Sequence, residues 1–116
     1  MKALVCGGRN YLDYEHVNEV LTSFENFRGD KITEVIHGAA KGTDSLAGRW
    51  ASENNIPAQA FPADWSAYGR GAGPIRNKQM LIEGRPDIVI AFPGGAGTAN
   101  MIKQAKYHGL SVVVIK

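Results

Sequence analysis

The sequence predicts an α/β fold, a single domain built on a mainly parallel five-stranded sheet with helices on both faces. Short apolar runs alternate with helical patterns from one end of the chain to the other, as in sheets whose parallel strands are joined by helices. These runs are continuously apolar, which is typical of strands that are covered on both faces. The length of 116 residues suits one domain and is too short for two.

The elements follow one another in a regular order. Strands are predicted from apolar runs and helices from apolar residues that share one helical face, such as Val17, Leu21 and Phe24. The predicted strands are 3–6, a segment centred on 35–36, 58–61, 87–92 and 112–115. The predicted helices run from Asp13 past Phe24, from 43 or 44 to about 54, from about 75 to 83 and from 98 to 108.

Local signals mark the ends of several elements. Asp13 is a suitable N-cap for the first helix, and Thr43 or Asp44 for the second, because short polar side chains accept hydrogen bonds from free backbone N–H groups. Pro57 closes the turn before the third strand. Gly109 occupies the place of a helix C-cap.

The segment 62–74 is predicted to be irregular. Thirteen residues is long for a connection in so compact a domain, and such loops are usually functional or disordered. Asp64, Trp65 and Tyr68 argue against disorder. Trp65 and Tyr68 either stack on a nucleobase or cover the edge of the core, and the sequence leaves both interpretations open.

Composition excludes several classes of function. The formal net charge of +2 is too small, and its charges too dispersed, to predict a nucleic-acid-binding face. Cys6, the only cysteine, lies in an apolar strand, so we predict no disulfide and no thiolate metal site. No apolar run approaches the roughly 20 residues that span a bilayer, and the chain enters a strand at its first residues without a signal-peptide pattern. We therefore expect a cytoplasmic protein that does not bind membranes.

Two glycine-rich loops each join a strand to a helix. Residues 93–98 read Pro-Gly-Gly-Ala-Gly-Thr, and glycines at a helix start expose backbone amides that bind phosphate or another anion. Residues 37–44 read His-Gly-Ala-Ala-Lys-Gly-Thr-Asp and lack the spacing of the P-loop that binds Mg-ATP. A shorter segment, Gly7-Gly8-Arg9, follows the first strand, and its arginine is suited to pair with a phosphate or carboxylate.

Because ligands bind at the carboxyl ends of parallel strands, these loops and the segment 62–80 are expected to converge on one crevice. The predicted ligand-binding residues are Gly7, Gly8, Arg9, His37, Gly38, Gly42, Thr43, Asp44, Asp64, Trp65, Arg76, Asn77, Pro93, Gly94, Gly95, Gly97, Thr98 and Asn100.

Some of these residues also have a purely structural interpretation. His37 is either a ligand contact or a structural histidine, and Thr43 and Asp44 either cap a helix or contact the ligand. Arg76 is predicted in the first turn of a helix, where its charge opposes the helix dipole, so a bound anion would explain it. The alternative is an exposed basic residue.

Five motifs in sequence order resemble the YspA/YpsA-related branch of the SLOG superfamily. That superfamily has a Rossmann-like fold and includes the LONELY GUY phosphoribohydrolases, ligand-sensing domains and a single-stranded DNA-binding domain. The resemblance implies binding of a nucleotide or a nucleotide-derived ligand, and a homo-oligomer. The motifs are Gly7-Gly8-Arg9, His37-Gly38-x-Ala40-x-Gly42-x-Asp44, Ala63-Asp64-Trp65, Ala72-Gly73-Pro74-x-Arg76-Asn77-x-x-Met80 and Ala91-Phe92-Pro93-Gly94-Gly95-x-Gly97-Thr98.

The chain departs from the hydrolases at one position. Their loop reads P-G-G-x-G-T-x-x-E, and its glutamate works with an arginine that matches Arg76. Met101 occupies the glutamate position here, and a thioether cannot act as a base. Losing such a carboxylate costs about two to four decades in rate.

We therefore predict a binding protein, a sensor or sequestering protein for a nucleotide-derived small molecule, with no metal and no cofactor. The sequence leaves two alternatives open. One is a nucleoside-monophosphate N-glycosidase that uses Asp44 or Asp64 as its carboxylate. The other is single-stranded nucleic-acid binding, which the weak charge disfavours.

Overall fold

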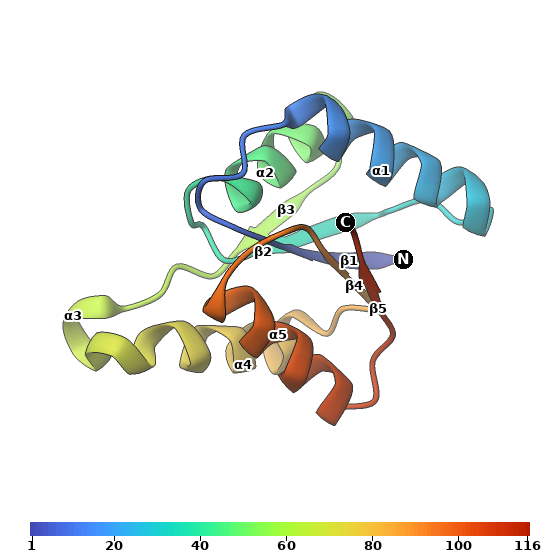
Figure 1. Cartoon of the computed structure of the whole chain (residues 1–116). Helices are drawn as coiled ribbons and strands as arrows, with labels where there is room; N and C mark the ends of the chain where they lie inside the picture. Colours follow the sequence, from blue (N-terminus) through green and yellow to red (C-terminus); the bar gives the residue numbers. More distant parts are fainter.

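A computed structural model describes all residues, 1–116, and contains one five-stranded sheet (Figure 1). The strands lie in the order β3-β2-β1-β4-β5, and every neighbouring pair is parallel. The predicted α/β fold is confirmed, and its sheet is entirely parallel. The strands are β1 (Lys2–Cys6), β2 (Glu34–His37), β3 (Ala58–Ala60), β4 (Ile88–Ala91) and β5 (Val112–Val114).

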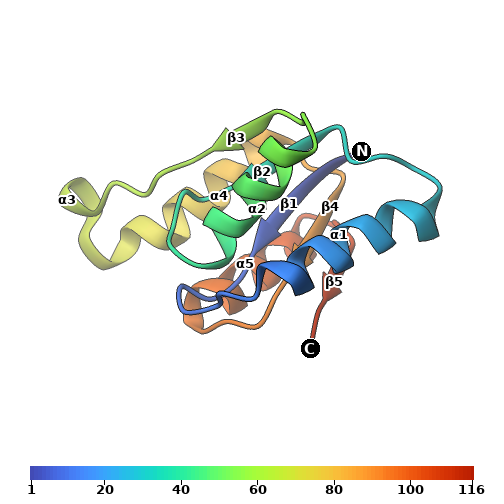
Figure 2. The same ribbon diagram turned by 90° about the horizontal axis from the view of Figure 1, so that it is seen from above.

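Helices cover both faces of the sheet. Figures 1 and 2 show α1 (Tyr14–Arg28) and α2 (Thr43–Glu53) on one face, and α4 (Ala72–Gly84) and α5 (Ala96–Tyr107) on the other. The short helix α3 (Trp65–Tyr68) and the 3-10 turn η1 (Gly69–Gly71) precede α4 and project beyond the end of the sheet. None of these helices is both long and apolar enough to cross a membrane.

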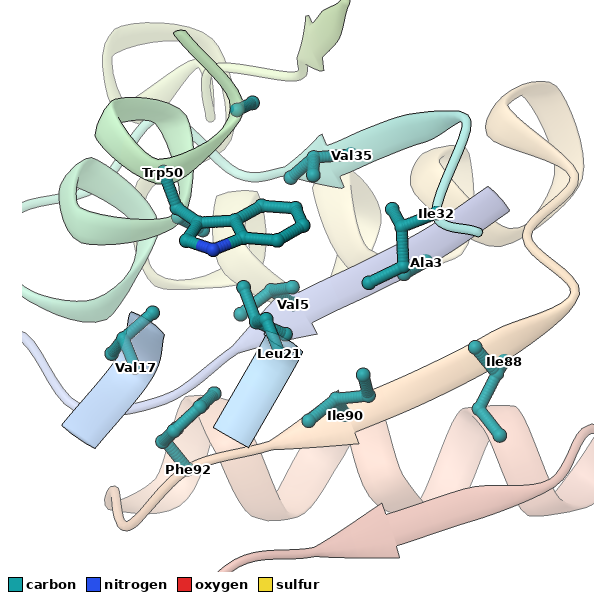
Figure 3. Close-up of a cluster of buried hydrophobic side chains, with 12 residues drawn as sticks. Ala3, Val5, Val17, Leu21, Ile32, Val35, Trp50, Ile88, Ile90 and Phe92 are labelled. Atoms are coloured by element: carbon teal, nitrogen blue, oxygen red, sulfur yellow. The ribbon is translucent and has the colours of Figure 1, made fainter. Parts of the chain in front are cut away.

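The sheet separates two apolar clusters. Alternate residues of a strand point to opposite faces, so Ala3 and Val5 of β1 pack beneath α1 and α2, whereas Leu4 packs against α4 and α5. Trp50 of α2 is fully buried over the sheet in the first cluster, where Figure 3 shows it beside Val35. Burial on both faces explains why the strand sequences are continuously apolar.

The predicted cap of the first helix is confirmed and that of the second is wrong. The Asp13 side chain accepts a hydrogen bond from the His16 N–H at the start of α1. Helix α2 instead has Gly42 as its N-cap, without a side-chain cap. Thr43 and Asp44 lie inside the first turn, and both side chains bond to neighbouring loops.

The segment 62–74 is more regular than predicted. Asp64 accepts a hydrogen bond from the Ala67 N–H and thereby closes the single turn of α3. Helix α4 begins at Ala72, because Pro74 falls in its first turn, where a missing N–H costs no helical hydrogen bond. Arg76 consequently lies beyond the first turn, and its charge does not oppose the helix dipole as predicted.

The sheet reverses its strand order around β1. The chain leaves β1 toward α1 on one face and leaves the neighbouring β4 toward α5 on the other. In open parallel sheets the two connections diverge at such a point and leave a crevice at the carboxyl ends of the strands. The fold therefore places a possible ligand site between the ends of β1 and β4.

Candidate functional site

A cleft of about 360 Å³ lies at the carboxyl ends of β1 and β4. It brings together many of the predicted residues from all three glycine-rich segments and from α4, so the predicted convergence on one crevice is confirmed. The lining residues are Cys6, Gly7, Gly8, Arg9, Ala40, Asp44, Trp65, Gly73, Arg76, Asn77, Met80, Gly95, Ala96, Gly97 and Thr98.

The start of α5 forms one wall of this cleft. Gly95 is the N-cap and makes no side-chain cap, so the first backbone N–H groups of a 12-residue helix have no capping side chain. A Cβ added at Gly95 or at Gly97 would meet no atom within 4 Å. The backbone is therefore open to the cleft at these positions. Free N–H groups and the positive end of the helix dipole favour an anion here.

Other glycines serve the contacts between loops. A Cβ at Gly94 would lie 2.7 Å from the backbone nitrogen of Gly8, and that nitrogen donates a hydrogen bond of 2.8 Å to the Pro93 carbonyl. Gly42 has a φ of 76°, and a Cβ there would collide with the carbonyl of Gly8. Gly42, Pro93 and Gly94 therefore hold the loops together and do not line the cleft.

Arg76 is fixed by the protein. Its Nη1 donates to the carbonyl of Gly38, and its Nε donates to Oδ1 of Asn77 at 3.1 Å. Asn77 is buried and in turn donates through Nδ2 to the carbonyl of Gly97 and to Oδ1 of Asn100. Asn100 thus supports the site from behind without lining the cleft. Burial lowers the pKa of Arg76, and Asp44 opposes that shift.

Asp44 is the acidic residue that lines the cleft. Its Oδ2 accepts hydrogen bonds of 3.2 Å from the N–H groups of Gly38 and Ala40, whereas Oδ1 makes none within the protein. The residue is only 7% exposed. Burial raises the pKa of this carboxyl, and the bonded amides together with Arg76 and His37 oppose the shift.

His37 and Thr43 have structural roles. Nδ1 of His37 accepts a hydrogen bond from the Ala39 N–H at 3.0 Å, so the proton of the neutral ring is on Nε2, away from that bond. Burial lowers the pKa of His37, which favours this neutral form. The Thr43 hydroxyl donates to the carbonyl of Gly8. Neither side chain lines the cleft.

Arg9 and Trp65 flank the cleft together. The guanidinium carbon of Arg9 lies 5.2 Å from the centre of the Trp65 ring, a cation–π arrangement. Trp65 is 47% exposed, so its ring is available to a ligand. Tyr68 lies outside the cleft, and Asp64 caps α3 rather than lining it.

Sequence reasoning did not select Cys6, Ala40, Gly73, Met80 or Ala96 as site residues. Two of them could have been identified because they lie next to predicted site residues. Cys6 ends β1 directly before Gly7, and Met80 lies one helical turn beyond Arg76. Burial raises the pKa of Cys6 to about 12, so it is a thiol and not a nucleophile. Met101 is fully buried in the core beneath the cleft.

Known proteins resemble this chain in sequence and in fold. Gene 61 protein of Mycobacterium phage D29 is 33% identical over an alignment of 119 positions, which covers 97% of this chain and 94% of the phage protein. DNA processing protein A (DprA) of Streptococcus pneumoniae superposes with a TM-score of 0.76 at 20% identity. That match covers 99% of this chain but only 50% of the DprA chain. The structure of TM1055 gives a TM-score of 0.67 at 19% identity and covers 97% and 72% of the two chains.

The two structural matches are too distant in sequence to show more than the shared Rossmann-like fold. The family is shown by the sequence. The model of the family described as YspA, cpYpsA-related SLOG matches residues 1–68, which contain two of the three glycine-rich segments, Gly7-Gly8-Arg9 and the loop 37–44. The chain belongs to the YspA, cpYpsA-related SLOG family.

Proposed function

We propose that this protein binds a nucleotide or a nucleotide-derived small molecule in the cleft and acts as a sensor or sequestering protein. The observation that carries the proposal is the open backbone of Gly95 and Gly97 at the start of α5, in the same cleft as Arg9 and Arg76. A phosphate at that helix start would accept hydrogen bonds from the free N–H groups. The two guanidinium groups would balance its charge.

The size of the cleft narrows the ligand class. Its volume of about 360 Å³ lies near the lower end of the range of small-molecule sites, about 300–1,000 Å³. A mononucleotide suits this space better than a dinucleotide. Trp65 and Arg9 offer flat surfaces on which a base or sugar of such a ligand would pack.

Calorimetric titration with three probes tests the binding proposal. We expect adenosine 5′-monophosphate to bind, inorganic phosphate to bind weakly and adenosine to bind at least tenfold more weakly than its monophosphate. Equal affinity for adenosine and its monophosphate would contradict a phosphate site at α5, and so would the absence of binding by every nucleoside phosphate tried.

Binding without hydrolysis is part of this proposal. The position that carries glutamate in the phosphoribohydrolases holds a methionine that is buried in the core, and Asp44 is the carboxylate that remains at the cleft. Wild-type protein incubated with adenosine 5′-monophosphate should therefore release adenine and ribose 5-phosphate slowly or not at all. Turnover at about 1 s⁻¹ or faster would identify an enzyme.

Arg76→Ala is expected to weaken binding of adenosine 5′-monophosphate by about 1.5–3 kcal/mol, the scale of a hydrogen bond between charged groups. Calorimetric titration measures the change. The control is Arg70→Ala, which removes the same charge from an exposed position in η1 outside the cleft. Unchanged affinity in the Arg76 variant, or equal losses in both variants, would rule out a direct contact with the phosphate.

We also propose that the protein forms a homo-oligomer, as its resemblance to the SLOG superfamily implies. Light scattering by the purified protein, with and without adenosine 5′-monophosphate, would measure its molar mass in solution.

A further inference from the structure

The cleft is electrostatically polarised. The α5 helix start makes one side attractive to an anion, whereas Asp44 places a carboxylate on the side of the loop after β2, where Arg9 and Arg76 also lie. Oδ1 of this carboxylate has no hydrogen-bond partner in the protein, although the residue is more than nine-tenths buried. No buried side-chain oxygen of the protein lacks a partner, so Oδ1 is accessible from the cleft, where a ligand can donate a hydrogen bond to it.

Asp44 is held rigidly in this position. Its other oxygen is fixed by two backbone N–H groups of the loop that follows β2, and the residue lies in the first turn of α2. The carboxylate therefore does not depend on a ligand for its orientation. A pre-oriented acceptor loses less entropy on binding than a mobile one, so its hydrogen bond to a ligand contributes more fully to affinity.

The sheet fixes the approximate spacing of the two ends of the cleft. Asp44 is bonded to the loop at the end of β2, the α5 helix start follows β4, and β1 lies between these strands. Two strand spacings amount to about 10 Å. A ligand with its phosphate at α5 would thus reach Asp44 with groups beyond the phosphate. The negative charge of Asp44 repels a second phosphate there, and Arg76, which is bonded to the Gly38 carbonyl beside it, offsets only part of that repulsion.

We propose that Asp44 determines specificity by accepting a hydrogen bond from an uncharged donor on the ligand, which makes the ligand class a nucleoside monophosphate with one anionic end and one donor end. The donor is either a ribose hydroxyl or an N–H of the base. This inference rests on the proposed function, because it assumes that the phosphate occupies the α5 side.

Three ligands and two variants test the inference by calorimetric titration. Adenosine 5′-monophosphate carries both donors, its 2′,3′-dideoxy form lacks the sugar hydroxyls, and purine riboside 5′-monophosphate lacks the exocyclic amine. Asp44→Asn preserves an oxygen for the bonds from the Gly38 and Ala40 N–H groups but turns an amide toward the cleft in place of the carboxylate oxygen. The matched control, Asp64→Asn, makes the same change at an exposed position in the α3 cap.

We expect one of the two altered ligands to bind the wild type at least tenfold more weakly than adenosine 5′-monophosphate, which corresponds to the loss of a hydrogen bond to a charged group. The ligand that is weakened identifies the donor. Asp44→Asn should reduce this preference to less than threefold, and Asp64→Asn should retain it. The wild-type comparison remains informative if Asp44→Asn folds poorly.

The outcomes separate this inference from the proposed function. If no nucleoside monophosphate binds to the wild type, the proposed function fails. If adenosine 5′-monophosphate binds tightly and adenosine does not, but all three monophosphates bind equally, the phosphate site stands and the role of Asp44 is wrong. The same conclusion follows if Asp44→Asn retains the full preference of the wild type.

Discussion

Replacing Gly95 by valine is expected to abolish binding of adenosine 5′-monophosphate while leaving the protein folded. The backbone at this position faces open space in the cleft, and an added Cβ would meet no protein atom within 4 Å. The branched side chain would instead occupy the volume next to the free N–H groups of α5. Because the proposed phosphate needs that volume, affinity should fall at least about 100-fold, or about 2.7 kcal/mol.

Calorimetric titration and thermal unfolding together measure this result. The free energy of unfolding should change by no more than about 1 kcal/mol, the usual effect of altering an N-cap residue. The control is Gly71→Val at the start of α4, where an added Cβ would make only an ordinary contact with Ile75 and would lie outside the cleft. Retention of affinity by the Gly95 variant would show that the ligand does not use the α5 helix start.

Gly94 and Gly95 show where reasoning from the sequence ends. Both belong to one glycine-rich loop, and the pattern predicts the same ligand contact for each. In the structure, Gly94 packs against the backbone of Gly8, and only Gly95 is open to the cleft. The difference comes from a tertiary contact between segments more than 80 residues apart, which no local pattern encodes.

Thr43 and Asp44 illustrate the same limit. Their residue types predict a helix cap, because an isolated helix start offers them no other partner. The fold supplies competing partners, the carbonyl of Gly8 for Thr43 and the loop amides of Gly38 and Ala40 for Asp44. In contrast, the strands and the convergence of the loops were predictable. They follow from the apolar runs and from the rule that parallel strands end at one edge of the sheet.

Met101 occupies the position of the hydrolase glutamate, and it is buried in the core of this protein. Met101 lies with Met80, Val89 and Ala105 in the apolar cluster under α4 and α5, and none of its surface is exposed. A carboxylate added there would not enter an open site ready for catalysis. It would be placed in the core, where neither water nor a charged partner would stabilise it.

Met101→Glu is therefore expected to destabilise the fold by about 3–5 kcal/mol, the cost of an unpaired buried charge. That is a large share of the roughly 5–15 kcal/mol that stabilises a typical domain. Burial would raise the pKa of the new carboxyl above its unfolded value of about 4.3, so the folded state would retain the proton more strongly than the unfolded state. The loss of stability should thus be smaller below pH 4.3 and should grow as the pH rises above it.

Urea unfolding of the wild type and of three position-101 variants, followed from pH 4 to pH 8, measures this effect. Met101→Leu should cost less than about 1.5 kcal/mol because it nearly conserves volume. Met101→Gln should be destabilised without the added dependence on pH, because its amide does not titrate in this range. Met101→Glu should also release no adenine from adenosine 5′-monophosphate above the wild-type rate. A glutamate variant as stable as the leucine variant at pH 8 would show that position 101 reaches the cleft. A glutamate variant that gains hydrolysis would show, in addition, that the methionine alone separates this protein from the hydrolases.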